Sequence, residues 1–178
     1  MVADVNIMRI TAAGCTLTDI TSACTRVSTS DSPTPGAGNP IPVPTSGSNY
    51  SYWLSTILYA ACAPDNSITN ITWYTDGSNT FGTGTQGTVI TASEYVPATG
   101  TSGSSGIILS TACHLGLNGA PSDLFLYASG CQLAVAGSIA TATGSFPDDH
   151  VVLQVSIDTT ASPGNSGEET VTWQFDEA

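Results

Sequence analysis

The chain has 178 residues, a length that suits one domain, and only 9% of them are charged. Fourteen carboxylates accompany two arginines and no lysine, so the formal net charge is −12. This balance argues against binding to nucleic acid or to anionic lipid, because both require cations that meet phosphate groups. It also excludes catalysis through a lysine Schiff base. No run of the chain approaches about eighteen apolar residues, so no membrane-spanning helix is expected.

Alternation of apolar and polar residues predicts strands along much of the chain. Residues 4–11 place Val5, Ile7 and Arg9 on one face. Residues 50–62 are mostly apolar and fit one buried strand, a pair of strands or a single helix. Strand-forming residues favour further strands at residues 68–75, 88–96, 107–112, 124–128, 133–135 and 139–143.

Two alternating runs lie near the C-terminal end, at residues 151–158 and 170–176. Their period of two is typical of half-buried strands. A Pro-Gly loop separates the runs, so we expect an antiparallel hairpin with Trp173 and Phe175 as core anchors.

Many short strands with turn signals between them predict an all-β fold, either an antiparallel β-sandwich or a jelly-roll-like barrel with long Gly/Pro/Ser/Thr-rich loops. Residues 1–178 are expected to form a single β domain. Residues 30–49 are predicted to form a Pro-rich arm or long loop, partly polyproline in character. Its prolines are the candidate interaction residues: Pro33, Pro35, Pro40, Pro42 and Pro44.

The five cysteines are an odd number and form no C-x-x-C pair, which argues against a zinc ribbon or a redox motif. Small apolar neighbours around Cys62 and Cys113 favour cysteines that act as small buried hydrophobic residues. Pairing across hairpins, Cys15 with Cys24 or Cys113 with Cys131, is the alternative, and metal ligation is a third.

No constellation in the sequence points to catalysis, so the protein is predicted not to be an enzyme and to need no cofactor. The G-x-G-x-x-G at residues 82–87 precedes a strand-like run rather than a helix. Nothing marks a serine as the partner of His114 or His150. The candidate calcium ligands are the loop carboxylates Asp148, Asp149 and Asp76. These are also ordinary turn residues, so no metal is assigned.

Two stretches carry a resemblance to a known class of proteins: Ile71-Thr72-Trp73-Tyr74-Thr75-Asp76-Gly77 and the ending from Ser162 to Glu177. In style they resemble the small β-sandwich structural proteins of tailed bacteriophages, which include capsid decoration (cement) proteins and some tail proteins. The resemblance implies a virion structural protein, and the leading hypothesis is a decoration protein that stabilises the head lattice through repeated protein–protein contacts.

The partners that this hypothesis implies are further copies of the chain, often as a trimer in that class, and the major capsid protein. Neither nucleic acid nor a membrane is expected as a partner. Residues 1–6 include neither a cationic side chain nor an apolar run, so no secretory signal is expected there. The expected location is the head surface of the virion, after synthesis in the host cytoplasm.

Other functions remain open. A tail tube or fibre protein is the nearest variant. A carbohydrate-binding or adhesin module would stack sugars on aromatic side chains, for which the candidates are Tyr50, Tyr52, Trp53, Trp73, Tyr74 and Tyr95. The competing interpretation makes Trp73 and Trp173 core anchors. The charge is uneven: both arginines lie within the first 26 residues and seven carboxylates within the last 31. This asymmetry fits either a head-to-tail contact between copies or a solvated acidic face.

Overall fold

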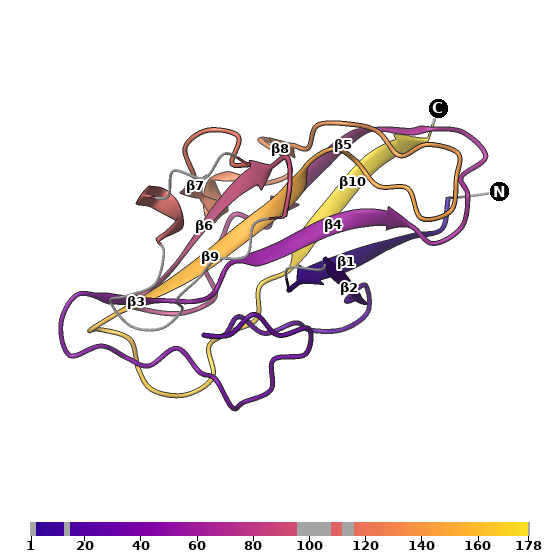
Figure 1. Ribbon diagram of the computed structural model, residues 1–178. Helices are drawn as coiled ribbons and strands as arrows, with labels where there is room; N and C mark the ends of the chain where they lie inside the picture. Colours follow the sequence, from indigo (N-terminus) through magenta and orange to yellow (C-terminus); the bar gives the residue numbers. More distant parts are fainter. Residues whose placement is uncertain (1–2, 13–14, 96–107, 112–115, 178) are drawn as a thin grey trace.

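The computed structural model describes residues 3–12, 15–95, 108–111 and 116–177 (Figure 1). Within these residues the regular elements are strands and short 3₁₀ turns, with no α-helix and no helix that could cross a membrane. The elements are β1 (Val5–Thr11), β2 (Thr16–Asp19), β3 (Ser48–Tyr50), β4 (Leu54–Ala60), β5 (Ile68–Thr75), β6 (Thr85–Ala92), η2 (Leu109–Thr111), β7 (Ser122–Asp123), η3 (Leu124–Leu126), β8 (Leu133–Ala134), β9 (His150–Asp158) and β10 (Val171–Glu177).

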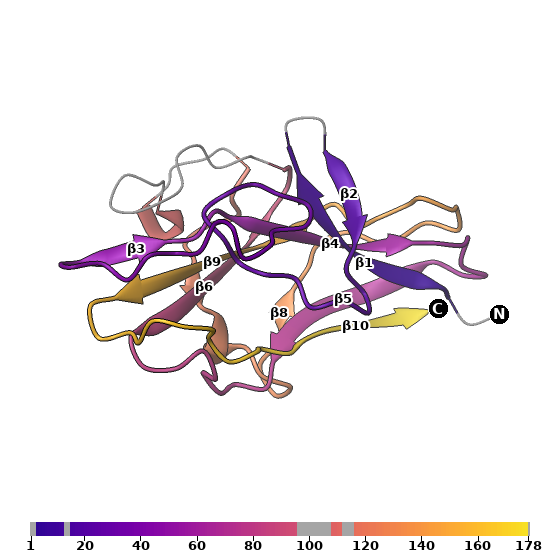
Figure 2. The ribbon, with the colours of Figure 1, turned by 90° about the horizontal axis from the view of Figure 1, so that it is seen from below.

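The strands form two antiparallel sheets that pack face to face (Figures 1 and 2). The larger sheet has the order β2-β1-β4-β9-β6-β7, and β3 also pairs with β9. The smaller sheet has the order β10-β5-β8. The predicted all-β, antiparallel β-sandwich is therefore confirmed.

The main core lies between the two sheets. Trp73 of β5 and Val151 of β9 are both 0% exposed and belong to one apolar cluster. Leu58 of β4 and Val89 of β6, which come from central strands of the large sheet, belong to the same apolar cluster. This burial of apolar area is the dominant favourable term for the fold.

The second face of the large sheet is also covered. Val152 of β9 packs with Trp53, Ile90 and Leu109 in a smaller apolar cluster. The side chain of Gln154 fixes this cover, since its Oε1 accepts a hydrogen bond from the Leu109 backbone N–H at 2.7 Å. The expectation that β9 is half-buried was therefore wrong: from His150 to Val155 only Leu153 is not fully buried.

The predicted C-terminal hairpin is wrong, although both of its strands exist. β9 lies at the centre of the large sheet, whereas β10 pairs with β5 in the small sheet, with Trp173 opposite Trp73. The Pro-Gly loop thus crosses from one sheet to the other, as Figure 1 shows in yellow. Alternation identifies a strand but not its partner, because a loop of this length can join strands within a sheet or between sheets.

The remaining strand predictions had mixed outcomes. Residues 50–62 supply the end of β3 and the whole of β4, which follow one another along β9. Of residues 107–112, the structure describes 108–111, of which 109–111 form the 3₁₀ turn η2, and residues 124–128 begin with the 3₁₀ turn η3. Residues 139–143 contribute only a single bridge, between Ile139 and Ile68. Short apolar runs do not distinguish a strand from another buried turn.

Candidate interaction surface

The connection between β2 and β3, residues 20–47, contains no strand and is here called the arm. It includes most of the predicted Pro-rich segment, whose last two residues belong instead to β3. The arm runs along the lower side of the molecule in Figure 1. Connections of this length without regular structure usually carry function or remain disordered, so the contacts that hold this one are informative.

Arg9 anchors the first part of the arm. It lies in β1 with 2% of its surface exposed. One guanidinium nitrogen, Nη1, donates hydrogen bonds to the Thr25 hydroxyl at 2.8 Å and to the Arg26 carbonyl at 3.0 Å. Burial lowers the pKa of Arg9, and the charge of Asp31 partly offsets that shift. One of the two cations of the chain, Arg9, is therefore buried and hydrogen-bonded to the arm of the same chain.

Asp31 is the second anchor. One carboxylate oxygen, Oδ2, accepts hydrogen bonds from the Tyr95 hydroxyl at 2.6 Å and from the Ala12 backbone N–H at 2.8 Å. Desolvation and this hydrogen bond both raise the pKa of Tyr95, so its hydroxyl keeps its proton. Asp31 therefore links the arm to the end of β1 and to the residues that follow β6.

Two further hydrogen bonds, one between backbone groups and one from a side chain, close the rest of the arm. The Thr29 N–H donates to the Asn39 carbonyl at 3.0 Å, which makes residues 30–38 a closed loop. Toward β3, the side-chain Nδ2 of Asn49 donates to the Pro42 carbonyl at 2.6 Å. The arm is therefore folded against its own sandwich, and the interaction role of its prolines stays a prediction.

The candidate prolines do not form one surface. Pro35 is buried at the turn of the closed loop and Pro44 is half-buried, so both pack within the chain. Pro33, Pro40 and Pro42 are exposed and are the prolines that a partner can reach.

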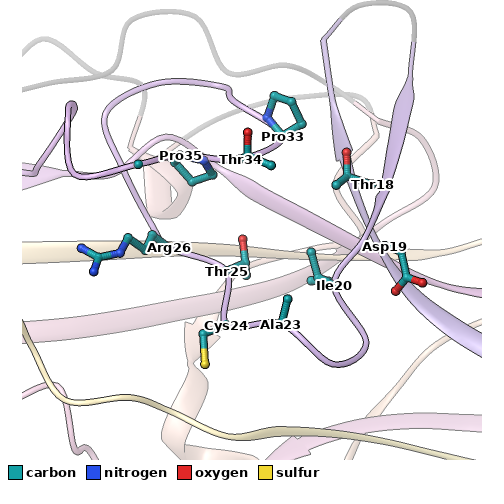
Figure 3. A pocket seen from close by; sticks show the side chains of 11 residues that line it. Thr18, Asp19, Ile20, Ala23, Cys24, Thr25, Arg26, Pro33, Thr34 and Pro35 are labelled. Atoms are coloured by element: carbon teal, nitrogen blue, oxygen red, sulfur yellow. The ribbon is translucent and has the colours of Figure 1, made fainter.

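A groove of about 330 Å³ lies between two parts of the arm, next to the end of β2 (Figure 3). Pro33, Thr34 and Pro35 form one side, and the start of the arm, including Ile20 and Ala23, forms the other. The Arg26 side chain extends away from the groove in Figure 3. The groove is therefore lined mainly by small and apolar side chains.

Comparisons with known proteins add no name. No family model, no curated protein and no solved structure matches this chain.

The calcium candidates do not come together as a site. Asp148 is exposed, whereas the neighbouring Asp149 is buried and accepts a hydrogen bond from Asn118 at 2.8 Å. Asp76 lies in another loop, where its carboxylate accepts from the Ser78 N–H at 2.8 Å. Among the described residues no group of three His, Cys, Asp or Glu side chains could hold a metal ion.

The aromatic residues that were candidates for sugar stacking are either buried or half-buried. Trp53 is 3% exposed and Trp73 is 0% exposed, which confirms Trp73 as a core anchor. Trp173 is half-buried and packs against the same core cluster. The tyrosines of that set are half-buried too: Tyr50, Tyr52, Tyr74 and Tyr95.

The cysteine interpretation needs correction. Cys62 is exposed, so its small apolar neighbours do not place it in the core. Cys15 and Cys24 are free rather than paired, and Cys131 is free as well. Cys113 and His114 lie outside the described residues.

The other histidine, His150, is 8% exposed and lies at the start of β9. Burial lowers its pKa, and the neighbouring Asp149 partly offsets that shift.

A second hollow, of about 340 Å³, lies between residues 80–85 and 161–167 and is lined by no charged side chain.

Sequence reasoning missed the anchoring role of Arg9, Asp31 and Tyr95. One signal was available, because Arg9 alternates with the apolar residues Val5 and Ile7 on one face of the predicted strand. A cation at such a position must find polar partners, since burying an unpaired charge is costly. The identity of those partners depends on where the arm returns to the sheet.

Proposed function

We propose that this protein is a virion structural protein of the capsid decoration type, which stabilises a head lattice by repeated contacts with the major capsid protein and with further copies of itself. The observation that supports this most is the arm, which is fixed to its own sandwich by part-buried hydrogen bonds while it presents exposed prolines. An ordered arm loses little conformational entropy when a partner binds it.

Surface chemistry supports the same proposal. Arg9 is buried, so Arg26 is the one exposed cation among the described residues, and the exposed surface is otherwise acidic or uncharged. High net charge keeps free copies soluble and apart. Individually weak contacts then become effective only when a lattice presents many sites at once.

The carbohydrate-binding alternative has less support. A sugar platform needs an exposed aromatic face, and the tryptophans Trp53 and Trp73 are both buried. A tail tube or fibre protein remains compatible with the same fold, and the choice of particle in the experiment separates it from a head protein.

The experiment uses virions of the encoding virus that were assembled without this protein. Purified chain is added to isolated heads and, separately, to isolated tails, and co-sedimentation measures the bound copies. We expect saturable binding to heads, with a fixed number of copies per head, and a higher temperature of DNA release. Saturable binding to tails alone would move the function to the tail, and binding to neither would remove the proposal.

The arm is tested by a triple variant: Pro33→Ala, Pro40→Ala and Pro42→Ala. These prolines are exposed, so the fold should remain intact while the affinity for heads falls by about tenfold or more. Pro163→Ala is the matched control, because Pro163 is an exposed proline in the loop between β9 and β10. An equal effect of both variants would show that the arm has no special role.

A further inference from the structure

The edges of the two sheets differ in how well they are protected against pairing with another chain. β7 and β8 have two residues each. β10 is longer, but it carries a register shift between Gln174 and Asp176 and ends in two carboxylates. Short strands, irregular register and charge are the usual devices that prevent edge-to-edge association.

β2 is also short, with four residues, but its first three residues carry neither a charge nor a register shift. Its sequence is Thr16-Leu17-Thr18-Asp19, and on its inner side it pairs with β1 in regular register. No backbone hydrogen bond joins its outer side to another segment of the described chain. Leu17 is 36% exposed, one of the large apolar side chains that this surface leaves open.

The position of β2 leaves this edge accessible. In Figure 2 the hairpin of β1 and β2 projects away from the sandwich, and open space adjoins the outer side of β2. The single carboxylate of the strand, Asp19, is engaged within its own chain, where it accepts hydrogen bonds from Asn6 at 2.8 Å and from the Thr21 N–H at 2.9 Å.

The charge distribution indicates what can approach this edge. Residues 1–64 hold three carboxylates and both arginines, a net charge of −1, whereas residues 65–178 hold eleven carboxylates and no cation, a net charge of −11. Within β1 and β2 the charged side chains are Arg9 and Asp19, one of each sign, so two copies that meet through this hairpin bring no excess of like charge to the contact. A second copy of this chain therefore fits the β2 edge through the same edge of its own.

We propose that β2 is a self-association edge, at which β2 of a second copy pairs antiparallel about a two-fold axis and joins the two large sheets into one. With the axis at Leu17, the two Leu17 side chains meet, and Thr16 of each copy lies opposite Thr18 of the other. Moving the axis to Thr18 would instead place Leu17 opposite Asp19. The contact is isologous, so it closes as a dimer and does not propagate as a fibre.

This inference deepens the proposed function, because it names one contact between copies, and it rests on that function only for its biological role. The paired segments are short, so we expect weak association, with a dissociation constant of roughly 100 µM. A contact of this strength becomes significant between copies that a lattice already holds side by side.

Sedimentation equilibrium of the full chain, from about 5 µM to about 1 mM, tests the proposal. The wild-type chain should pass from monomer to dimer over this range. Leu17→Lys places a charge at the centre of the pairing and should weaken dimerisation at least tenfold. The control is Leu126→Lys, since Leu126 is 65% exposed and lies in η3, away from β2. It should dimerise as the wild type does.

A cross-link tests the register. Leu17→Cys should give a disulfide-linked dimer under mild oxidation, because opposed residues in an antiparallel pair bring their Cβ atoms within disulfide reach. The wild-type chain and Leu126→Cys, which contain the same native cysteines, measure the background and should cross-link much less.

A wild-type chain that stays monomeric throughout, or a Leu17→Lys variant that dimerises normally, would overturn the proposal. If such a chain still binds heads, the proposed function survives without this contact. Conversely, a chain that dimerises through β2 but binds neither heads nor tails supports the self-association edge and removes the proposed function.

Discussion

Arg9 joins strand β1 to the arm through hydrogen bonds. Its guanidinium is buried and donates a hydrogen bond to the Arg26 carbonyl, which belongs to the peptide bond that follows Arg26. Trypsin cleaves after arginine and lysine, and this chain holds only Arg9 and Arg26 as targets. Because Arg9 is buried in a paired strand, Arg26 is the accessible target, and its cleavage reports how often the arm opens.

We therefore expect the native protein to be cut slowly and only after Arg26. Arg9→Met keeps much of the apolar volume but removes both hydrogen bonds to the arm, so cleavage should accelerate about tenfold or more. Time-resolved mass spectrometry of the digest measures the rate. Asn6→Ala is the control, since it loses a hydrogen bond from the same strand to Asp19 rather than to the arm. An unchanged rate in Arg9→Met would show that Arg9 does not hold the arm.

His150 predicts a pH dependence of stability. Burial lowers its pKa below the ordinary value of 6.5, so the unfolded chain takes up this proton before the folded chain does. Its contribution to stability is present above pH 6.5 and is lost as the pH falls through the folded pKa. The free energy of unfolding, measured with urea at pH 7.5 and at pH 5.5, should fall by up to about 1 kcal/mol in the wild type. The His150→Gln variant should fall less, and equal losses would contradict this origin.

At the scale of elements, β5 is the central strand of the small sheet and β10 is an edge strand beside it, and Trp73 and Trp173 lie opposite each other in this pair. Trp73 is fully buried, and its indole N–H has no hydrogen-bond partner among the described residues. Its contribution is therefore packing rather than polar contact.

The two tryptophans should differ in their cost when removed. Trp73→Ala should lower the free energy of unfolding by about 3–5 kcal/mol, because it leaves a cavity in the main core. Trp173→Ala should cost less, since that ring is half-buried at the edge of the sheet. Trp73→Phe keeps most of the packing and should cost less than Trp73→Ala. Urea unfolding followed by circular dichroism measures all three, and equal costs for Trp73→Ala and Trp173→Ala would contradict this description.

The elements also show where local pattern stops being informative. Residues 68–75 were predicted as a strand with the bounds that β5 has, because Ile, Thr, Trp and Tyr alternate there and a turn dipeptide ends the run. β6 begins earlier than predicted, at Thr85, and includes Gly87. The side chain of Leu124 occupies the place where a Cβ of Gly87 would lie, so this glycine serves a tertiary contact rather than a turn.

At the scale of the whole molecule, the excess of carboxylates should set the response to salt. The net charge of −12 opposes the compact state through self-repulsion, and added ions screen that repulsion. Raising NaCl from about 20 mM to about 500 mM should therefore raise the midpoint of thermal unfolding. A midpoint that falls over this range would show that specific ionic contacts outweigh the repulsion.

The loss of stability that carboxylates cause in acid should occur at a lower pH than the loss that His150 causes. Hydrogen bonds from Thr21 and Thr160 hold the pKa values of Asp19 and Asp158 below their ordinary value. Their contributions are therefore present at neutral pH and are lost only as the pH falls below about 3.8, well under the range in which His150 acts.

The sequence by itself argued against binding to nucleic acid and anionic lipid, because charge balance is a property of the composition. It also determined the fold class, because strand alternation and turn residues are local patterns. It located β1, β5, β9 and β10, and it marked the proline-rich connection. Tertiary structure alone decided that β10 leaves β9 for the other sheet, that both faces of β9 are covered, that Cys62 is exposed, and that Arg9, Asp31 and Tyr95 hold the arm. Each of these features depends on how residues far apart in the chain pack together, and the local sequence pattern does not determine which distant segments come into contact.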